Sequence, residues 1–134
     1  MAATLLLIAA LAMTEPEVPA TQAETDAALF DAAVGCAAYH IYMASNATPQ
    51  SDAAKQSEEK AVMFLLASYA KMPQDKPEVA EARIEETVKG LFEDSATIEP
   101  EKHKSEMEQL NQACIGFEPK ALAIVDEEGY GAAK

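Results

Sequence analysis

From residue 22 onward, apolar and polar residues recur with the spacing of amphipathic helices. The stretch 22–45 shows this most clearly, because Phe30, Val34 and Ile41 lie four and seven residues apart on one helical face. The same spacing recurs further along the chain. The helices that the pattern predicts cover residues 22–45, 51–71, 77–93 and 100–115.

The residues between these stretches mark where helices begin and end. Thr21, followed three residues later by Glu24, fits a capping box at the start of the first helix. Two prolines within 72–77 predict a break between the second and third helices. Gly116 fits the left-handed position just past the end of the fourth, and a short fifth helix can follow over 119–125.

No alternating pattern of useful length for a strand appears, so the expected fold class is all-α. With four amphipathic segments and short connections, the simplest architecture is a small up-down four-helix bundle. We assign this bundle to residues 21–128, as one domain, and expect residues 129–134 to form a frayed tail.

The first twenty residues have the pattern of an export signal. An apolar run over 5–11 is much too short to span a bilayer but has the length of a signal-peptide core. Small residues follow it, which predicts cleavage between Ala12 and Ala23. No Lys or Arg precedes the run, which is atypical, and the alternative is an apolar first turn of a core helix. We interpret residues 1–20 as a signal peptide and flexible spacer, and the protein as exported, periplasmic or secreted.

Composition and charge narrow the range of partners. The chain has 134 residues, of which 28 are Ala and none is Trp, and 23 acidic residues against 10 basic ones give a net charge of −13. Nucleic acids and anionic membrane surfaces would repel such a protein. We therefore expect no nucleic-acid partner and no stable membrane insertion after signal cleavage, and favour a basic protein partner.

The chain has two cysteines, Cys36 in the first predicted helix and Cys114 near the end of the fourth. Both lie on apolar faces, and an even number of cysteines in an exported chain predicts a disulfide. We expect a structural bond joining the first and fourth helices. The alternative is a pair of reduced, buried thiols. No C-x-x-C motif supports a catalytic role in disulfide exchange.

The two histidines are the remaining candidates for a metal or haem site. His40 follows Cys36 by one helical turn, and His103 lies near the start of the fourth helix. A zinc site with both cysteines is disfavoured, because His103 is about 16 Å along the helix from Cys114. His40 and His103 could oppose each other as axial haem ligands. We expect instead one half-buried, hydrogen-bonded histidine and an exposed His103, with no metal ligand and no cofactor.

No catalytic constellation is visible in the sequence. It lacks a Ser-His-Asp order, a phosphate-cradling glycine loop and the Glu-x-x-His pairs of di-iron bundles. The leading hypothesis is thus a non-enzymatic, exported acidic protein that binds a protein partner as an inhibitor, immunity-type protein or chaperone. The alternative is a small periplasmic haem or metal carrier that uses His40 and His103.

Overall fold

The computed structural model describes residues 21–72 and 76–127 of the chain, and this part is built from four helices. They are α2 (Gln22–Asn46), α3 (Asp52–Lys71), α4 (Pro77–Thr97) and α5 (Pro100–Glu127). The expected all-α fold with four packed helices is confirmed for these residues. The assigned signal peptide and spacer (1–20) and the tail (129–134) lie outside the described residues.

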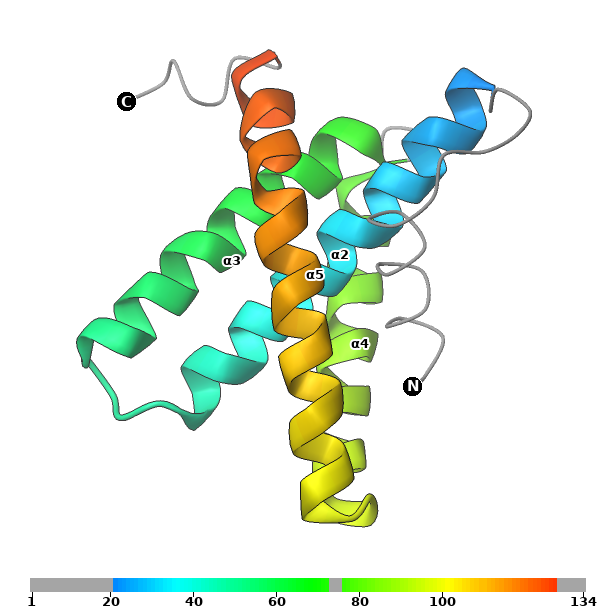
Figure 1. Ribbon diagram of the computed structural model, residues 1–134. Helices are drawn as coiled ribbons and strands as arrows, with labels where there is room; N and C mark the ends of the chain where they lie inside the picture. The colour runs from blue at the N-terminus through cyan, green and yellow to red at the C-terminus, as the bar shows by residue number, and fades with distance from the viewer. Residues whose placement is uncertain (1–20, 73–75, 128–134) are drawn as a thin grey trace.

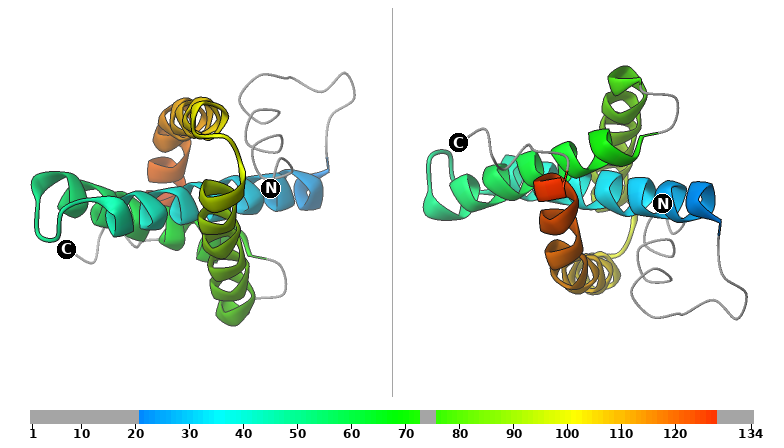
Figure 2. Two further views of the ribbon diagram at one scale, coloured as in Figure 1. Left: turned by 90° about the horizontal axis from the view of Figure 1, so that it is seen from below. Right: turned by 90° about the horizontal axis from the view of Figure 1, so that it is seen from above.

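The helix α2 lies at the centre of the molecule and contacts each of the other three helices. The next helix, α3, returns alongside α2 in the opposite direction (Figure 1). The remaining two helices, α4 and α5, run antiparallel to each other and cross α2 on opposite sides (Figure 2). As a result α2 is covered from three directions.

Half of the buried residues of α2 are small (Ala, Gly or Cys), and they allow the close approach of neighbouring helices. Twelve of its residues are buried, and the central alanines are almost completely inaccessible to solvent. By length and composition alone, α2 could also cross a membrane. The buried core helix of a folded domain has the same properties, and most of the apolar window of α2 is buried by its neighbours.

Side-chain caps begin the first two helices, as the sequence pattern indicates for Thr21. The hydroxyl oxygen of Thr21 accepts a hydrogen bond from the amide of Glu24 at 3.1 Å, and Ser51 accepts one from the amide of Ala54 at 3.2 Å. Each cap satisfies one of the amides that lack a partner in a first helical turn. Pro77 occupies the first turn of α4, where its missing amide costs nothing.

The prediction that the third helix ends at Glu93 is wrong, because α4 continues to Thr97. The hydroxyl groups of Ser95 and Thr97 donate to the carbonyls of Phe92 and Glu93, at 2.7 Å and 3.0 Å. Ser and Thr side chains often favour turns over helices, because they form hydrogen bonds with the nearby backbone. Here the hydroxyl groups donate to carbonyls of the preceding helical turn, an arrangement that a helix can accommodate.

The fourth helix does not end at Gly116 either, and the short fifth helix is its continuation. The helix α5 passes through Pro119 and ends at Glu127. Pro119 removes the amide that would donate to the carbonyl of Ile115, which ordinarily breaks or kinks a helix. The buried positions continue in phase across it, with Phe117 and Ala121 four residues apart. Packing of this stripe therefore outweighs the local preference for a break.

Candidate functional site

A disulfide joins Cys36 of α2 to Cys114 of α5, as expected from the two apolar stripes. The Cα atoms of the two residues are 5.6 Å apart, and both side chains are completely buried. The bond connects the first and last described helices across 78 residues of sequence. No cysteine is left free. Because solvent does not reach either sulfur, the position of the bond fits a structural role rather than thiol exchange.

Three rings form a stack, and two of them follow the cysteines by about one helical turn along the chain. His40, four residues after Cys36, stacks on Phe64 of α3 with 5.6 Å between ring centroids. Phe64 stacks in turn on Phe117 of α5, three residues after Cys114, with 6.0 Å between centroids. These rings link α2, α3 and α5. The disulfide and the stack together form the centre of the core.

His40 is held neutral at physiological pH by its position in this stack. The pKa of His40 is lowered from 6.5 to about 4, mainly by burial and also by the nearby Lys60 cation, while the Glu118 carboxylate partly offsets both effects. Lys60 and Glu118 form an ion pair at 3.3 Å. Contrary to the expected hydrogen-bonded histidine, the Nδ1 atom of His40 is buried without a hydrogen-bond partner among the described residues. The ring therefore acts mainly as a packing element.

His103 is half-buried, so the expectation that it is exposed is wrong. Its Nε2 atom lies 3.1 Å from the hydroxyl of Tyr42, because the first turns of α5 pack against the second half of α2. Its Nδ1 atom is buried and has no hydrogen-bond partner within the described part of the chain.

The structure does not bring His40 and His103 together as a ligand pair. His40 packs toward Phe64, whereas His103 contacts Tyr42, which follows His40 by two residues in α2. Each residue of a helix is rotated by about 100° from the one before, so residues two apart point in nearly opposite directions. The histidines thus lie on nearly opposite sides of α2. Residues 21–72 and 76–127 contain no group of three or more His, Cys, Asp or Glu side chains that could hold a metal ion.

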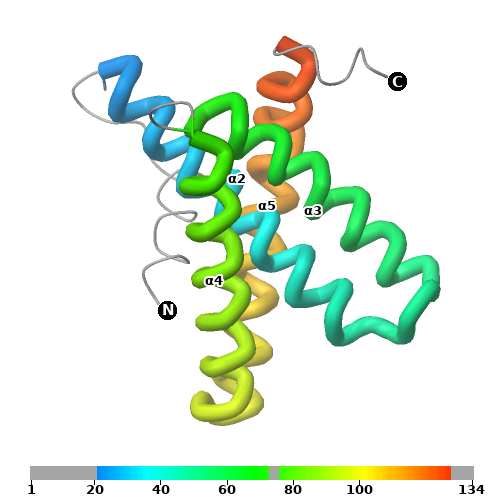
Figure 3. Tube along the Cα trace, turned by 180° about the vertical axis from the view of Figure 1, so that it is seen from behind, coloured from blue at the N-terminus to red at the C-terminus, as the bar shows by residue number. Residues whose placement is uncertain are grey.

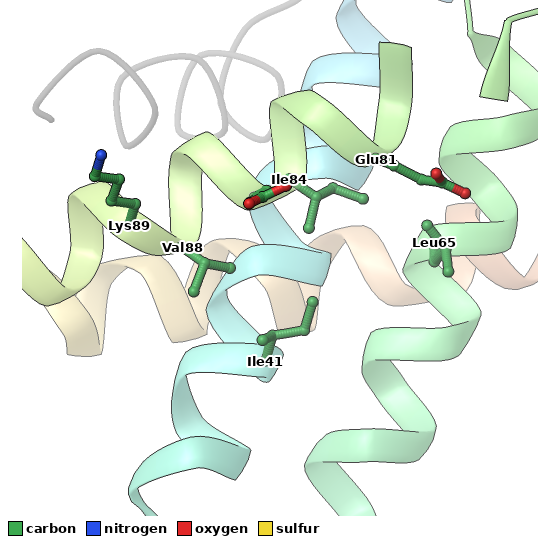
Figure 4. Close-up of a pocket in the computed structure, with 7 residues that line it drawn as sticks. Ile41, Leu65, Glu81, Ile84, Val88 and Lys89 are labelled. Atoms are coloured by element: carbon green, nitrogen blue, oxygen red, sulfur yellow. The ribbon is translucent and has the colours of Figure 1, made fainter. Parts of the chain in front are cut away.

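An open groove between α3 and α4 is the feature that the sequence did not indicate. Its aliphatic lining comes from three helices (Figure 4). The lining residues are Ile41 of α2, Leu65 of α3, and Ile84 and Val88 of α4, with Glu81, Glu85 and Lys89 of α4 as the charged members. The groove has a volume of about 570 Å³ and an almost entirely apolar surface. We call this feature the α3–α4 groove.

The carboxylates of the α3–α4 groove are not neutralised by ion pairs. Glu81 accepts a hydrogen bond from the hydroxyl of Tyr69 at 2.8 Å. Neither Glu81 nor Glu85 takes part in the three ion pairs found in the described residues. In Figure 4 the amine of Lys89 points away from the aliphatic side chains. The groove thus combines an apolar surface with two charged carboxylates along one wall.

Comparison with known proteins identifies no family. No protein-family model matches the chain, and no curated protein or solved structure is significantly similar to it. What the protein does must therefore be inferred from its own residues.

Proposed function

We propose that this protein is an exported, non-enzymatic binding protein whose partner is a basic protein. The observation that carries the proposal is the excess of negative charge that the fold does not neutralise internally. The chain has 23 acidic and 10 basic residues, yet only three ion pairs occur in its described part. Such a surface attracts a cationic partner and accelerates its association.

Exposed apolar side chains support a protein partner rather than a purely ionic one. Val62 of α3 is 55% exposed, and Ile115 and Leu122 of α5 are 51% and 48% exposed. Ile115 and Leu122 are two helical turns apart and so share one face of α5. Apolar side chains surrounded by charged ones are typical of surfaces that bind other proteins. Inhibition, immunity or shielding of a basic client would each use such a surface.

The disulfide supports export, because bonds of this kind persist in oxidising compartments. The prediction for residues 1–20 can be checked directly by mass spectrometry of the protein isolated from its own host. We expect a mature N-terminus within the window from Ala12 to Ala23. An intact Met1 on protein recovered from the cytoplasm would contradict export.

The proposed partner can be sought by affinity capture from the periplasmic fraction or culture medium of the host. The bait is the oxidised mature protein, and an unrelated acidic helical protein of similar size serves as the control. We expect one predominant basic protein that elutes with salt and binds again after purification. Recovery of the same proteins on both baits, or of an acidic partner, would contradict the proposal.

A further inference from the structure

We infer that the α3–α4 groove is the docking site for a cationic amphipathic helix of the partner. This inference rests on the proposed function and makes it specific. In Figure 3, α3 and α4 diverge, and α2 is visible between them. Direct contact between α3 and α4 is sparse. The side of α2 that carries Ile41 therefore remains only partly covered.

The helical walls of the groove determine how a ligand can be recognised. Backbone amides and carbonyls in the middle of helices are already hydrogen-bonded, so the walls offer no edge to which a β-strand could be added. Recognition must then come from side chains that pack against the aliphatic lining. An amphipathic helix laid into an apolar groove is the recurrent solution for a protein ligand.

The spacing of the α4 residues gives the length and pattern of the occupant. Glu81, Ile84, Glu85 and Val88 follow the spacing of one helical face, so that the wall extends over about 10 Å, or two turns. A matching helix would present apolar residues at positions i, i+3 or i+4, and i+7. It would cover the aliphatic lining while its polar side faces solvent.

Charge determines which amphipathic helix fits. Glu81 and Glu85 lie one turn apart, without an ion-pair partner in the described chain, and favour Lys or Arg beside the apolar stripe. Lys89 lies one turn further along α4 and would repel a ligand cation placed beside it. The groove therefore favours a helix whose cations lie near Glu81 over a helix with cations along its whole length. A second copy of this chain, with a net charge of −13, would be repelled.

The probe for this inference is a synthetic peptide of about 15 residues, a length at which isolated helices begin to be stable. It carries Leu at the i, i+3, i+4 and i+7 positions and Lys beside one end of this apolar stripe, and an acidic twin carries Glu in place of Lys. Binding to the oxidised mature protein is measured by fluorescence anisotropy. Methyl NMR spectra of Ile, Leu and Val then locate the contact on the protein.

Matched variants separate the local effect of the groove from the general effect of charge. Glu81→Gln with Glu85→Gln removes both groove carboxylates. Glu78→Gln with Glu86→Gln removes two exposed carboxylates of the same helix that do not line the groove. We expect the first pair of substitutions to weaken binding of the Lys peptide about three- to tenfold and the second pair less than about twofold.

The apolar lining is tested in the same way. Leu65→Ala shortens a half-buried groove residue, and Leu66→Ala shortens a half-buried residue of the same helix that does not line the groove. Thermal melting of each variant confirms that it folds. We expect only Leu65→Ala to weaken binding, and expect the methyl shifts to concentrate on Ile41, Ile84 and Val88.

Several results would overturn the inference. The acidic twin could bind as tightly as the Lys peptide, or both pairs of Gln substitutions could weaken binding equally. The methyl shifts could instead concentrate on Ile115 and Leu122 of α5. A natural partner that binds the wild type and the Glu81→Gln/Glu85→Gln variant equally would refute the groove but leave the proposed function intact. The absence of any basic partner would refute the proposed function, while the peptide measurements would still decide about the groove.

Discussion

Replacing both Cys36 and Cys114 by Ala should destabilise the fold by several kcal/mol without changing its helical architecture. The bond closes a loop of 78 residues between α2 and α5, the two ends of the described fold. In the chain-entropy model, a loop of this length contributes about 4.5 kcal/mol at 25 °C by restricting the unfolded chain. Removal of two fully buried sulfur atoms adds a smaller loss of packing.

This loss is large against the usual stability of a domain, which is about 5–15 kcal/mol. An Ala-rich core buries little apolar area for each residue, so this protein has little stability in reserve. With a shift of about 4 °C for each kcal/mol, the melting temperature should fall by about 15–20 °C. The double variant should still be folded at low temperature, because the helix contacts of α2 remain.

Urea unfolding followed by far-ultraviolet circular dichroism measures the effect. We expect a lower midpoint and a steeper denaturant dependence for the variant, since its unfolded chain exposes more surface without the bond. Reductant added to the wild type should reproduce the change only slowly, because both sulfurs are buried. Reductant added to the double variant is the control. A loss of less than about 1 kcal/mol, or two titratable thiols in the native protein, would refute the reasoning.

Two further predictions concern Gly116 and His40. Gly116→Ala should stabilise the protein by about 0.5–1 kcal/mol in the same assay, because Gly116 lies inside α5 and nothing lies within 4 Å of an added Cβ. Destabilisation would mean that the helix ends there after all. The pKa of His40 is lowered from 6.5 to about 4, mainly by burial. The unfolded chain therefore binds a proton that the native protein does not, so stability is full above about pH 6.5 and falls, by up to about 3 kcal/mol, as the pH drops toward 4. His40→Phe should flatten this dependence between about pH 5 and 6.5, and an unchanged slope would contradict the assignment.

Much of the fold could be predicted from short-range patterns. The cap at Thr21 requires only the residues that follow it, and the structure confirms it. The pairing of Cys36 with Cys114 required more, namely that the first and last helices are neighbours. It was predictable because both cysteines lie on apolar stripes and no third cysteine competes. The residues along the chain were therefore sufficient to predict both the helix cap and the disulfide.

The end of α5 was not predictable, because packing decided it. Gly116 and Pro119 both favour a break, yet the buried stripe through Phe117 continues α5 past them. The α3–α4 groove has a similar explanation. Ile41 and Val88 look like ordinary core positions in the sequence, and only the crossing of the helices leaves them half-buried.

The most direct test of the central claim is the ionic-strength dependence of binding to the partner captured from the host. The dissociation constant of the purified complex should be measured at low and at high salt, for the wild type and for the Glu81→Gln/Glu85→Gln variant. If carboxylates of this acidic protein attract a basic partner, salt should weaken wild-type binding strongly and binding of the variant less. An affinity that is independent of salt, or that rises with it, would contradict the account.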